Sequence, residues 1–287
     1  MENNRKIFVC GTPIGNISDI SFRVIEILKK VDIIAAEDTR KSGRLLKEYN
    51  IKTPLISFYK DNEKKRAEEL INRIQSGEKV ALISNAGMPG ISDPGYELIN
   101  RAVEQGITVV PVPGPTALVS ALVVSGLPMD RFVFEGFLPR KGKKRKNRLA
   151  DIKKEERTII VYESPYRIKQ TLQELEEMLG TRKIALVREL TKYYEEKIYG
   201  TCSDVLKQIA DREIKGELVL VIEGRTKTAP AEQLWTDLSV VEHVELLIDK
   251  GYTKKEAIKK VAEERDVSRR DVYKEAVVIN VGERKQD

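Results

Sequence analysis

The chain has 287 residues, 41% of them apolar, and a formal net charge of +6, which is typical of a globular protein with room for two or three domains. It contains no apolar stretch of membrane-spanning length and too short an apolar run at its start for a signal peptide, so we expect a cytoplasmic protein. Two distant cysteines, expected to be buried, and a single histidine argue against a disulfide framework, a metal site and a Ser-His-Asp triad.

Short β-branched runs alternate with helical patterns over residues 1–126. In chain order the predicted strands are KIFVC, DIIAAE, PLISF, KVALIS and ITVVPV. Three helices are predicted: one that begins near Ser21, one that runs through Leu45 and one over residues 63–75. Strands that alternate with helices of ten or more residues predict βαβ crossovers and a mainly parallel sheet with both faces covered. Residues 1–126 are therefore predicted to form an N-terminal α/β domain.

The same alternation resumes over residues 127–224. Its predicted strands are RFVFEGF, TIIVYE, IALVREL, EEKIYG and ELVLVIEG, with helices over residues 165–179 and 204–210. This predicts a second α/β domain. The polar run RTKTAPAEQ after Gly224 breaks the pattern, and residues 225–287 are expected to form a small helical domain.

Residues 225–287 contain two helix-capping patterns. Thr253 with Glu256, and Ser268 with Asp271, each place an acid three residues after a capping residue, which predicts two helix starts. The pair resembles a helix-turn-helix with Val267 at the turn. Residues 225–287 carry thirteen basic and thirteen acidic groups, so their charge does not by itself favour nucleic acid over simple packing. The candidate RNA contacts here are Arg269, Arg270 and Lys274.

The basic character of the chain is concentrated in residues 140–154. This segment, RKGKKRKNRLADIKK, holds nine basic residues and one acid, so the rest of the chain sums to −2. Such a run is either a solvated helix or loop face, or a contact for a polyanion. Without interleaved aromatic residues it would hold phosphates rather than read bases. The candidate RNA contacts are Arg140, Lys141, Lys143, Lys144, Arg145, Lys146 and Arg148.

Three Gly/Pro loops follow predicted strands of the first domain. They are GTPIGN (residues 11–16), SNAGMPGISDPG (84–95) and PVPGPTALVSA (111–121). In open α/β sheets the carboxyl ends of the strands form the ligand crevice, and mixed glycine and proline indicate rigid, shaped loops. Alternatively, these residues merely end their elements, which explains GMPG and PGP poorly. We expect GMPG to face a ligand, and Ser92 or Asp93 with Pro94 to begin the next helix.

The loops do not match two common nucleotide-binding fingerprints. None has the G-x-G-x-x-G pattern of dinucleotide-binding folds, and GFLPRKGKK misses the Walker A spacing and its final Ser or Thr. The pattern instead favours a flat, partly apolar ligand held by backbone groups. A helix start at Thr116 would offer free N–H groups to a carboxylate.

Taken with EDTR (residues 37–40), GFLPRK and YESPYR, the three loops resemble, in order and spacing, the ribosomal RNA small subunit methyltransferase I family of the tetrapyrrole methylase superfamily. The resemblance covers essentially the whole chain. It implies S-adenosylmethionine as methyl donor, two α/β domains with the cofactor in the cleft between them, and a homodimer. It also implies methyl transfer to the ribose 2′-oxygen of a cytidine in the decoding region of 16S ribosomal RNA.

By matching the family motifs, the resemblance implies that particular residues of this chain contact the cofactor. They are Pro13, Ile14, Ser84, Gly87, Met88, Ile91, Thr116 and Ala117, with Tyr162, Val187 and Leu218 from the second domain. Three positions depart from the family pattern. Asn85 stands where the family usually has aspartate, Met88 where it has threonine, and Tyr166 where it has histidine.

Methyl transfer to a hydroxyl needs a proton acceptor within hydrogen-bond reach. The candidates are Asp38 and Glu163, with Arg40 orienting the ribose or phosphate. The alternative for Asp38 is that it only caps the following helix, since Asp is favoured at helix starts.

Two rival functions stay open. Another enzyme of the superfamily, such as a porphyrin C-methyltransferase or diphthine synthase, would keep the loops but has no evident use for the basic segment or the helical tail. A non-catalytic RNA-binding protein would use both of those features and need no cleft.

Overall fold

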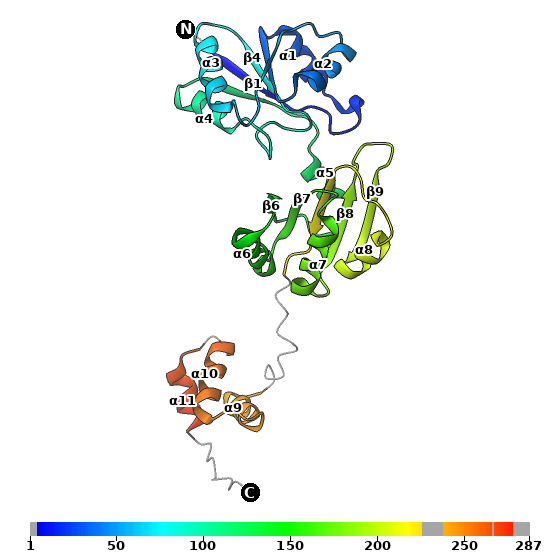
Figure 1. The fold of residues 1–287 in the computed structure, drawn as a ribbon. Helices are drawn as coiled ribbons and strands as arrows, with labels where there is room; N and C mark the ends of the chain where they lie inside the picture. The colour runs from blue at the N-terminus through cyan, green and yellow to red at the C-terminus, as the bar shows by residue number, and fades with distance from the viewer. Residues whose placement is uncertain (1–4, 226–237, 266, 278–287) are drawn as a thin grey trace. The chain divides into compact units, whose positions relative to one another are not determined.

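The computed structural model describes residues 5–225, 238–265 and 267–277, which fall into two compact units, Met1–Arg225 and Thr226–Asp287 (Figure 1). The first unit contains two five-stranded sheets, and the second is helical. Most of the polar run predicted after Gly224, from residue 226 onward, lies outside the described residues.

The N-terminal sheet is entirely parallel, as predicted, with strand order β3-β2-β4-β1-β5. Its strands are β1 (Lys6–Cys10), β2 (Ile33–Ala36), β3 (Leu55–Ser57), β4 (Val80–Ile83) and β5 (Thr108–Val112). All five point their carboxyl ends the same way, so the loops after β1, β4 and β5 emerge at one edge. These are the three Gly/Pro loops.

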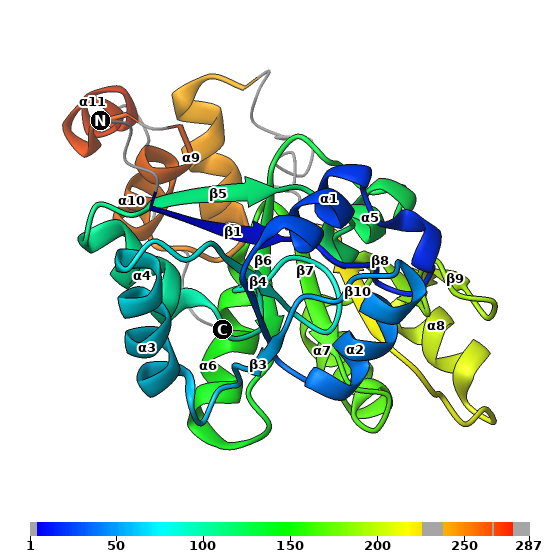
Figure 2. The ribbon, with the colours of Figure 1, turned by 90° about the horizontal axis from the view of Figure 1, so that it is seen from above.

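Helices cover both faces of this sheet (Figure 2). They are α1 (Phe22–Lys30) and α2 (Thr39–Glu48) on one face, and α3 (Glu63–Gln75) and α4 (Tyr96–Glu104) on the other. Leu28 and Leu46 pack with Cys10 on the first face, whereas Leu70 and Leu98 pack in the core of the second. Burial on both faces explains why the strands read as continuous apolar runs.

The second sheet has order β6-β7-β10-β8-β9, and only its β6–β7 pair is parallel. Its strands are β6 (Phe132–Phe137), β7 (Thr158–Glu163), β8 (Lys183–Arg188), β9 (Glu196–Thr201) and β10 (Leu218–Ile222). This half is α/β, as predicted, but it does not repeat the parallel arrangement of the first sheet. The connections from β7 to β8 and from β9 to β10 join strands of like direction. However, β10 lies between β7 and β8, and β8 lies between β10 and β9, so most neighbouring strands are antiparallel.

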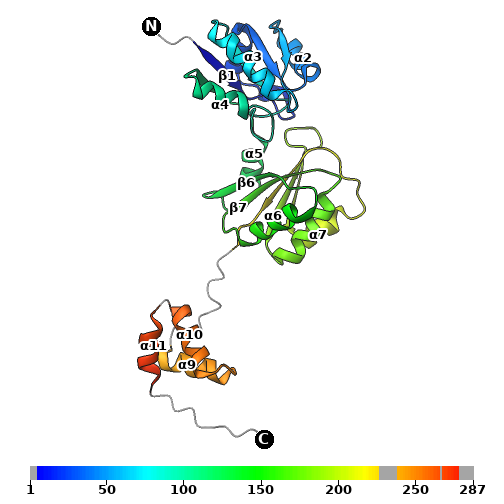
Figure 3. The ribbon, with the colours of Figure 1, turned by 60° about the vertical axis from the view of Figure 1, so that its left-hand side comes forward.

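The helices of this half are α6 (Gly142–Lys154), α7 (Ile168–Leu179) and α8 (Cys202–Ile209), which pack on one face of the second sheet (Figure 3). The opposite face is covered by α5 (Ala117–Val124), whose Ala121 and Leu122 pack with Val219 and Val221 of β10. Although its sequence precedes residue 127, α5 therefore packs with the second half. It brings the third Gly/Pro loop against the second sheet.

The C-terminal unit contains α9 (Val240–Asp249), α10 (Lys254–Arg265) and α11 (Arg269–Ala276) around a small apolar core. Both predicted helix starts are confirmed. The side chain of Thr253 accepts a hydrogen bond from the Glu256 backbone at 3.3 Å, and Ser268 accepts one from Asp271 at 3.2 Å.

Two further sequence features can be placed. Both cysteines are free and buried, as expected. Among the described residues, no helix combines the length and the apolar character needed to cross a membrane.

Candidate functional site

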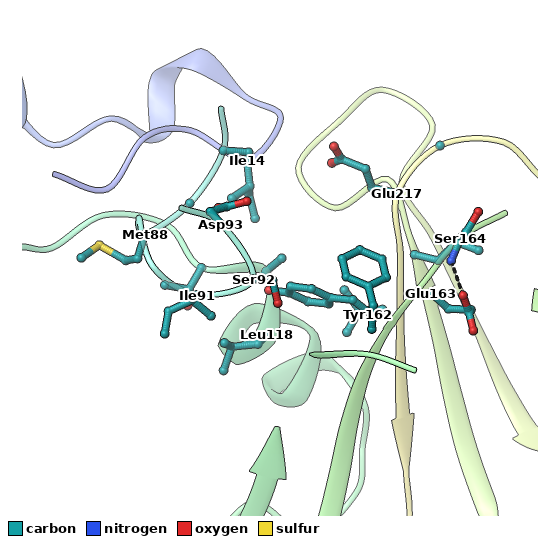
Figure 4. A pocket seen from close by; sticks show the side chains of 18 of the residues that line it. Ile14, Met88, Ile91, Ser92, Asp93, Leu118, Tyr162, Glu163, Ser164 and Glu217 are labelled. Carbon is teal, nitrogen blue, oxygen red and sulfur yellow. Dashed lines mark hydrogen bonds between the residues drawn. The ribbon is translucent and has the colours of Figure 1, made fainter. Parts of the chain in front are cut away.

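A pocket of about 380 Å³ lies between the two halves of the first unit (Figure 4). This volume is within the range of small-molecule sites. The N-terminal half contributes Ile14, Ala86–Met88 and Ile91–Asp93, and the third loop contributes Thr116, Ala117 and Leu118. The second half contributes Phe137, Tyr162, Glu163, Ser164, Pro165 and residues 216–219.

The three Gly/Pro loops are joined to one another at this pocket. Thr12 and Gly87 exchange two backbone hydrogen bonds, of 2.9 and 3.0 Å. A Cβ on Gly114 would lie 2.6 Å from the carbonyl oxygen of Gly11, so a side chain there would separate the first and third loops. These glycines are needed for close packing between loops. The alternative that they merely end their elements does not account for that contact.

The loop over residues 84–95 differs from its prediction in one respect. Helix α4 begins at Tyr96, not at Ser92 or Asp93, and the carboxylate of Glu63 caps it by accepting hydrogen bonds from the backbone of Gly95 (2.8 Å) and Glu97 (3.1 Å). Because a distant side chain supplies the cap, Asp93 is released from that role and lines the pocket.

Asp93 is the ionisable group in this pocket with the clearest perturbation. Burial raises the pKa of its carboxyl to about 6, and the nearby carboxylates of Glu37 and Glu217 act in the same direction, while a hydrogen bond from Ser84 opposes them. A carboxylate with a pKa near neutrality suits proton transfer. Sequence reasoning missed this residue because Ser-Asp-Pro reads as a helix start.

The opposite wall is aromatic and apolar. The ring of Tyr162 meets Phe134 and Phe137 edge to face, at centroid distances of 4.9 and 5.6 Å. Burial raises the pKa of Tyr162 to about 12, so its hydroxyl stays protonated. Thr116 makes no side-chain capping bond at the start of α5, and the backbone N–H of Leu118 in the first turn of that helix hydrogen-bonds the Tyr162 hydroxyl.

Eight of the eleven predicted cofactor residues line the pocket: Ile14, Gly87, Met88, Ile91, Thr116, Ala117, Tyr162 and Leu218. Ser84 is buried beneath the loop, where its hydroxyl donates to the Ala86 carbonyl at 3.1 Å. Val187 is buried in the core, paired with Val219. Pro13 lines an adjoining cavity.

This outer cavity has a volume of about 440 Å³ and shares Ile14, Ala86 and Glu217 with the first. Its remaining lining residues are Pro13, Gly15, Ile17, Arg44, Leu45, Glu48, Asn85 and Lys192. The side-chain oxygen Oδ1 of Asn85, the residue where the family usually has aspartate, is buried with no hydrogen-bond partner among the described residues. The outer cavity is therefore the more polar of the two.

Glu163 lines the 380 Å³ pocket, but its carboxylate already contacts three polar partners. It accepts hydrogen bonds from the Ser164 backbone (2.6 Å) and the Thr171 hydroxyl (2.7 Å), and it pairs with Arg167 at 2.6 Å. Its side chain is 0% exposed. Figure 4 shows it directed away from the loop wall that carries Asp93.

Asp38 caps α2. Its carboxylate accepts hydrogen bonds from the backbone N–H groups of Arg40 (2.9 Å) and Lys41 (3.3 Å), and these bonds hold its pKa below the usual value. Arg40 is exposed. Neither Asp38 nor Arg40 lines the 380 Å³ pocket.

The basic segment forms α6, and one of its residues is not on the surface. Arg145 is only 4% exposed, and its guanidinium pairs with Glu174 at 2.6 Å and donates to the Thr171 hydroxyl (2.8 Å) and the Pro139 carbonyl (3.0 Å). The structure thus places Arg145 in the interior, where it does not face RNA. The other candidates are exposed: Arg140, Lys141, Lys143, Lys144, Lys146 and Arg148.

Comparison with known proteins agrees with this architecture. Residues 6–206 match the family model of the tetrapyrrole (corrin/porphyrin) methylases. A diphthine synthase structure superimposes with a TM-score of 0.62 at 14% identity, covering 77% of this chain and 90% of its own. Uroporphyrin-III C-methyltransferase from Thermus thermophilus, in complex with S-adenosylhomocysteine, superimposes with a TM-score of 0.54 at 15% identity, covering 76% and 97%. The fold is that of a tetrapyrrole methylase, and the chain belongs to that family.

Curated relatives define the family more narrowly. Ribosomal RNA small subunit methyltransferase I of Halalkalibacterium halodurans is 46% identical over 273 residues, which is 95% of this chain and 94% of the relative. Its namesake from Bacillus subtilis is 46% identical over 93% of this chain and 92% of its own. The chain belongs to the ribosomal RNA small subunit methyltransferase I family, as the sequence motifs predict.

A third relative, from Thermotoga maritima, is also 46% identical, but over 220 residues, which is 77% of this chain and 99% of the relative. Since the first compact unit ends at Arg225, a match of this length can hold little more than that unit. The matched part of this chain therefore leaves out about as many residues as the helical unit contains. This relative has no counterpart to those residues.

Proposed function

We propose that this protein uses S-adenosylmethionine to methylate the ribose 2′-oxygen of a cytidine in the decoding region of 16S ribosomal RNA. The observation that carries the proposal is the pocket made by the three joined Gly/Pro loops, with Asp93 in its wall, in a chain 46% identical to its curated relatives. The exact nucleotide is taken from the family resemblance.

The residues of the pocket fit the cofactor. Apolar side chains and the aromatic ring of Tyr162 suit the adenine and ribose carbons, and the start of α5, where Thr116 makes no side-chain capping bond, suits the methionine carboxylate. The carboxylates of Asp93 and Glu217 would attract the positive sulfonium. When bound, the sulfonium supplies an activated methyl group. The S-adenosylhomocysteine complex of the Thermus thermophilus neighbour supports the same assignment.

Asp93 is the proposed proton acceptor. During methyl transfer the Asp93 carboxylate would take up the proton that leaves the 2′-hydroxyl. Glu163 would first have to give up three partners, and Asp38 caps a helix outside the pocket. Residues that hold the acceptor hydroxyl in position would supply much of the rate, on the order of 7–11 kcal/mol in favourable cases.

The acceptor and its RNA would approach over the outer cavity. Arg44 lines that cavity and Arg40 lies one helical turn before it on α2, which supports the proposed contact of Arg40 with ribose or phosphate. The remaining proposed phosphate contacts are exposed residues of the basic segment and of α11: Arg140, Lys141, Lys143, Lys144, Lys146, Arg148, Arg269, Arg270 and Lys274. Action on the small ribosomal subunit would place the protein in the cytoplasm.

Homodimerisation is also proposed. Helix α5 is apolar on both sides: Ala121 and Leu122 face the second sheet, while Val119 and Val123 are 45% and 62% exposed. An exposed apolar strip of this kind supports a contact with a second copy.

Two measurements test the function. Calorimetry with S-adenosylmethionine tests the pocket. A methyl-incorporation assay, followed by mapping of the modified nucleotide, compares small ribosomal subunits lacking the modification, free 16S RNA and a porphyrin precursor. We expect incorporation into RNA at one cytidine ribose. Methylation of the porphyrin alone would favour the rival enzyme, and absence of cofactor binding would favour a non-catalytic RNA-binding protein.

A further inference from the structure

The loop between β8 and β9, residues 189–195, carries two adjacent tyrosines at the surface. Tyr193 is 94% exposed and Tyr194 is 69% exposed. Their rings meet edge to face, with centroids 5.0 Å apart and planes at 89°. Other aromatic residues of the chain, such as Tyr166 and Phe22, are also exposed, but here two adjacent rings form one contiguous aromatic surface.

The loop that presents them is rigidly held. Glu189 and Thr191 adopt positive φ angles of 51° and 66°, which are unfavourable for residues other than glycine. The Thr191 backbone donates to Glu195 at 2.6 Å, and the Lys192 ammonium donates to Glu189 at 2.7 Å and to Glu217 at 3.0 Å. Strained backbone that its surroundings hold in place is concentrated at functional sites.

The loop also lies beside the catalytic region. The Thr191 hydroxyl accepts a hydrogen bond from the backbone of Asn16, in the first Gly/Pro loop, at 2.9 Å. A Cβ on Gly15 would lie 2.5 Å from Cγ of Lys192, so the two loops are in direct contact. Lys192 lines the outer cavity, and the tyrosines follow it directly in the chain.

We infer that Tyr193 and Tyr194 form a stacking surface for an unpaired RNA base next to the nucleotide being methylated. This inference rests on the proposed function and adds a recognition element to it. Exposed aromatic faces at the edge of a nucleotide site are the common means of holding splayed bases in single-stranded RNA. They would position the RNA so that its target ribose reaches the Asp93 pocket by way of the outer cavity.

The surroundings favour a base over a protein partner. Of the other exposed or half-exposed side chains of the loop, Glu189, Lys192 and Glu195 are charged and Thr191 is polar, and each has a hydrogen-bonded partner within or beside the loop. A stable protein interface needs about 800 Å² per partner with an apolar centre. Two rings among charged residues supply far less apolar area, but they are enough for one or two bases.

The test uses the intact protein and small ribosomal subunits that lack the modification. Filter binding without cofactor measures its affinity for the subunits, and a steady-state assay measures methyl transfer to them. The variants are the double substitutions Tyr193→Ala with Tyr194→Ala, and Tyr193→Phe with Tyr194→Phe. The matched control is Tyr96→Ala, because Tyr96 is 72% exposed and lines neither cavity.

We expect the double alanine variant to weaken binding and raise KM for subunits by about tenfold or more, with kcat and the affinity for S-adenosylmethionine little changed. The double phenylalanine variant should keep wild-type values, since the ring face is retained. Unchanged KM and affinity in the alanine variant would overturn the inference, as would an altered oligomeric state by sedimentation, which would assign the tyrosines to a second copy of the chain. If the tyrosines matter for subunit binding but the wild type methylates no RNA, their role as an RNA-stacking surface stands and the proposed reaction falls.

Discussion

The two walls of the pocket each carry a carboxylate, and the two are used differently. On the loop wall, Asp93 is partly buried near two other carboxylates, and its pKa is raised to about 6. On the strand wall, Glu163 is completely buried and neutralised by Arg167, with hydrogen bonds from Ser164 and Thr171. The difference shows that proximity to a pocket does not make a carboxylate available for chemistry. An acceptor must also have oxygen atoms without fixed partners.

The local backbone explains the difference. Successive side chains of a strand point to opposite faces. Along β7, Ile160 and Tyr162 pack in the core on the pocket side, whereas Ile159 and Val161 pack in the core under α6 and α7. Glu163 continues the second series, so its side chain turns toward α7, where Thr171 and Arg167 lie. Asp93 follows Ser92, whose positive φ of 64° turns the chain sharply just before it.

The largest expected effect comes from the substitution Asp93→Asn. Removing the proton acceptor should lower kcat by about 10²–10⁴-fold, the usual contribution of a general base. Calorimetry should show that S-adenosylmethionine binding persists, and the melting temperature should not fall, because the substitution removes a partly buried charge. The matched control is Glu217→Gln, which alters another carboxylate of the pocket that is 70% exposed and should cost far less activity. Wild-type turnover in Asp93→Asn would exclude this residue as the base.

The pH dependence of kcat/KM tests further whether Asp93 is the proton acceptor. The acceptor must be ionised, so kcat/KM should rise with pH through about 6 and then level off, and this inflection should vanish in Asp93→Asn. The raised pKa also means that Asp93 favours folding below its ordinary pKa of about 4 and loses that contribution as pH rises through about 6. The stability of Asp93→Asn relative to wild type, from denaturant unfolding, should therefore increase across this interval. A constant difference would contradict the assigned pKa.

Substitutions that disturb the strand wall should lower the stability of the protein more than its activity. Arg145 donates to Thr171, which in turn donates to Glu163, so one buried network joins the basic helix to the pocket wall. The substitution Arg145→Met leaves the Glu174 carboxylate and the Thr171 hydroxyl without this partner and should destabilise the protein by about 3–5 kcal/mol. Denaturant unfolding measures this. Lys144→Met, its exposed neighbour on α6, should leave stability nearly unchanged. Equal stability of the two variants would show that the network is dispensable.

Much of this architecture was accessible from sequence. Alternating apolar strands and helices predict two α/β halves, and three strand-end loops rich in glycine and proline predict the pocket, where eight of eleven expected cofactor residues lie. The order of strands in the second sheet was not accessible, because helical crossovers fix strand direction and leave the choice of neighbour open.

The remaining errors have particular physical causes. The role of Asp93 depends on Glu63, thirty residues earlier, which caps α4 in its place. The burial of Arg145 depends on Glu174 of α7, a tertiary contact that the composition of a basic run conceals. The direction of Glu163, by contrast, follows from the alternation along its own strand and was readable from the sequence.

The smallest expected effect separates the two interpretations of Asp38. Its carboxylate already accepts two backbone hydrogen bonds at the start of α2, and Asn at an N-cap accepts them almost equally well. If capping is its role, Asp38→Asn should match wild type in melting temperature and methyl transfer, and Asp38→Ala should melt a few degrees lower while keeping most of its turnover. If the ionised carboxylate accepts the proton, Asp38→Asn should instead lose activity while it melts normally. Because Asn preserves the cap and removes the charge, this one variant distinguishes the two roles, and we expect it to be active.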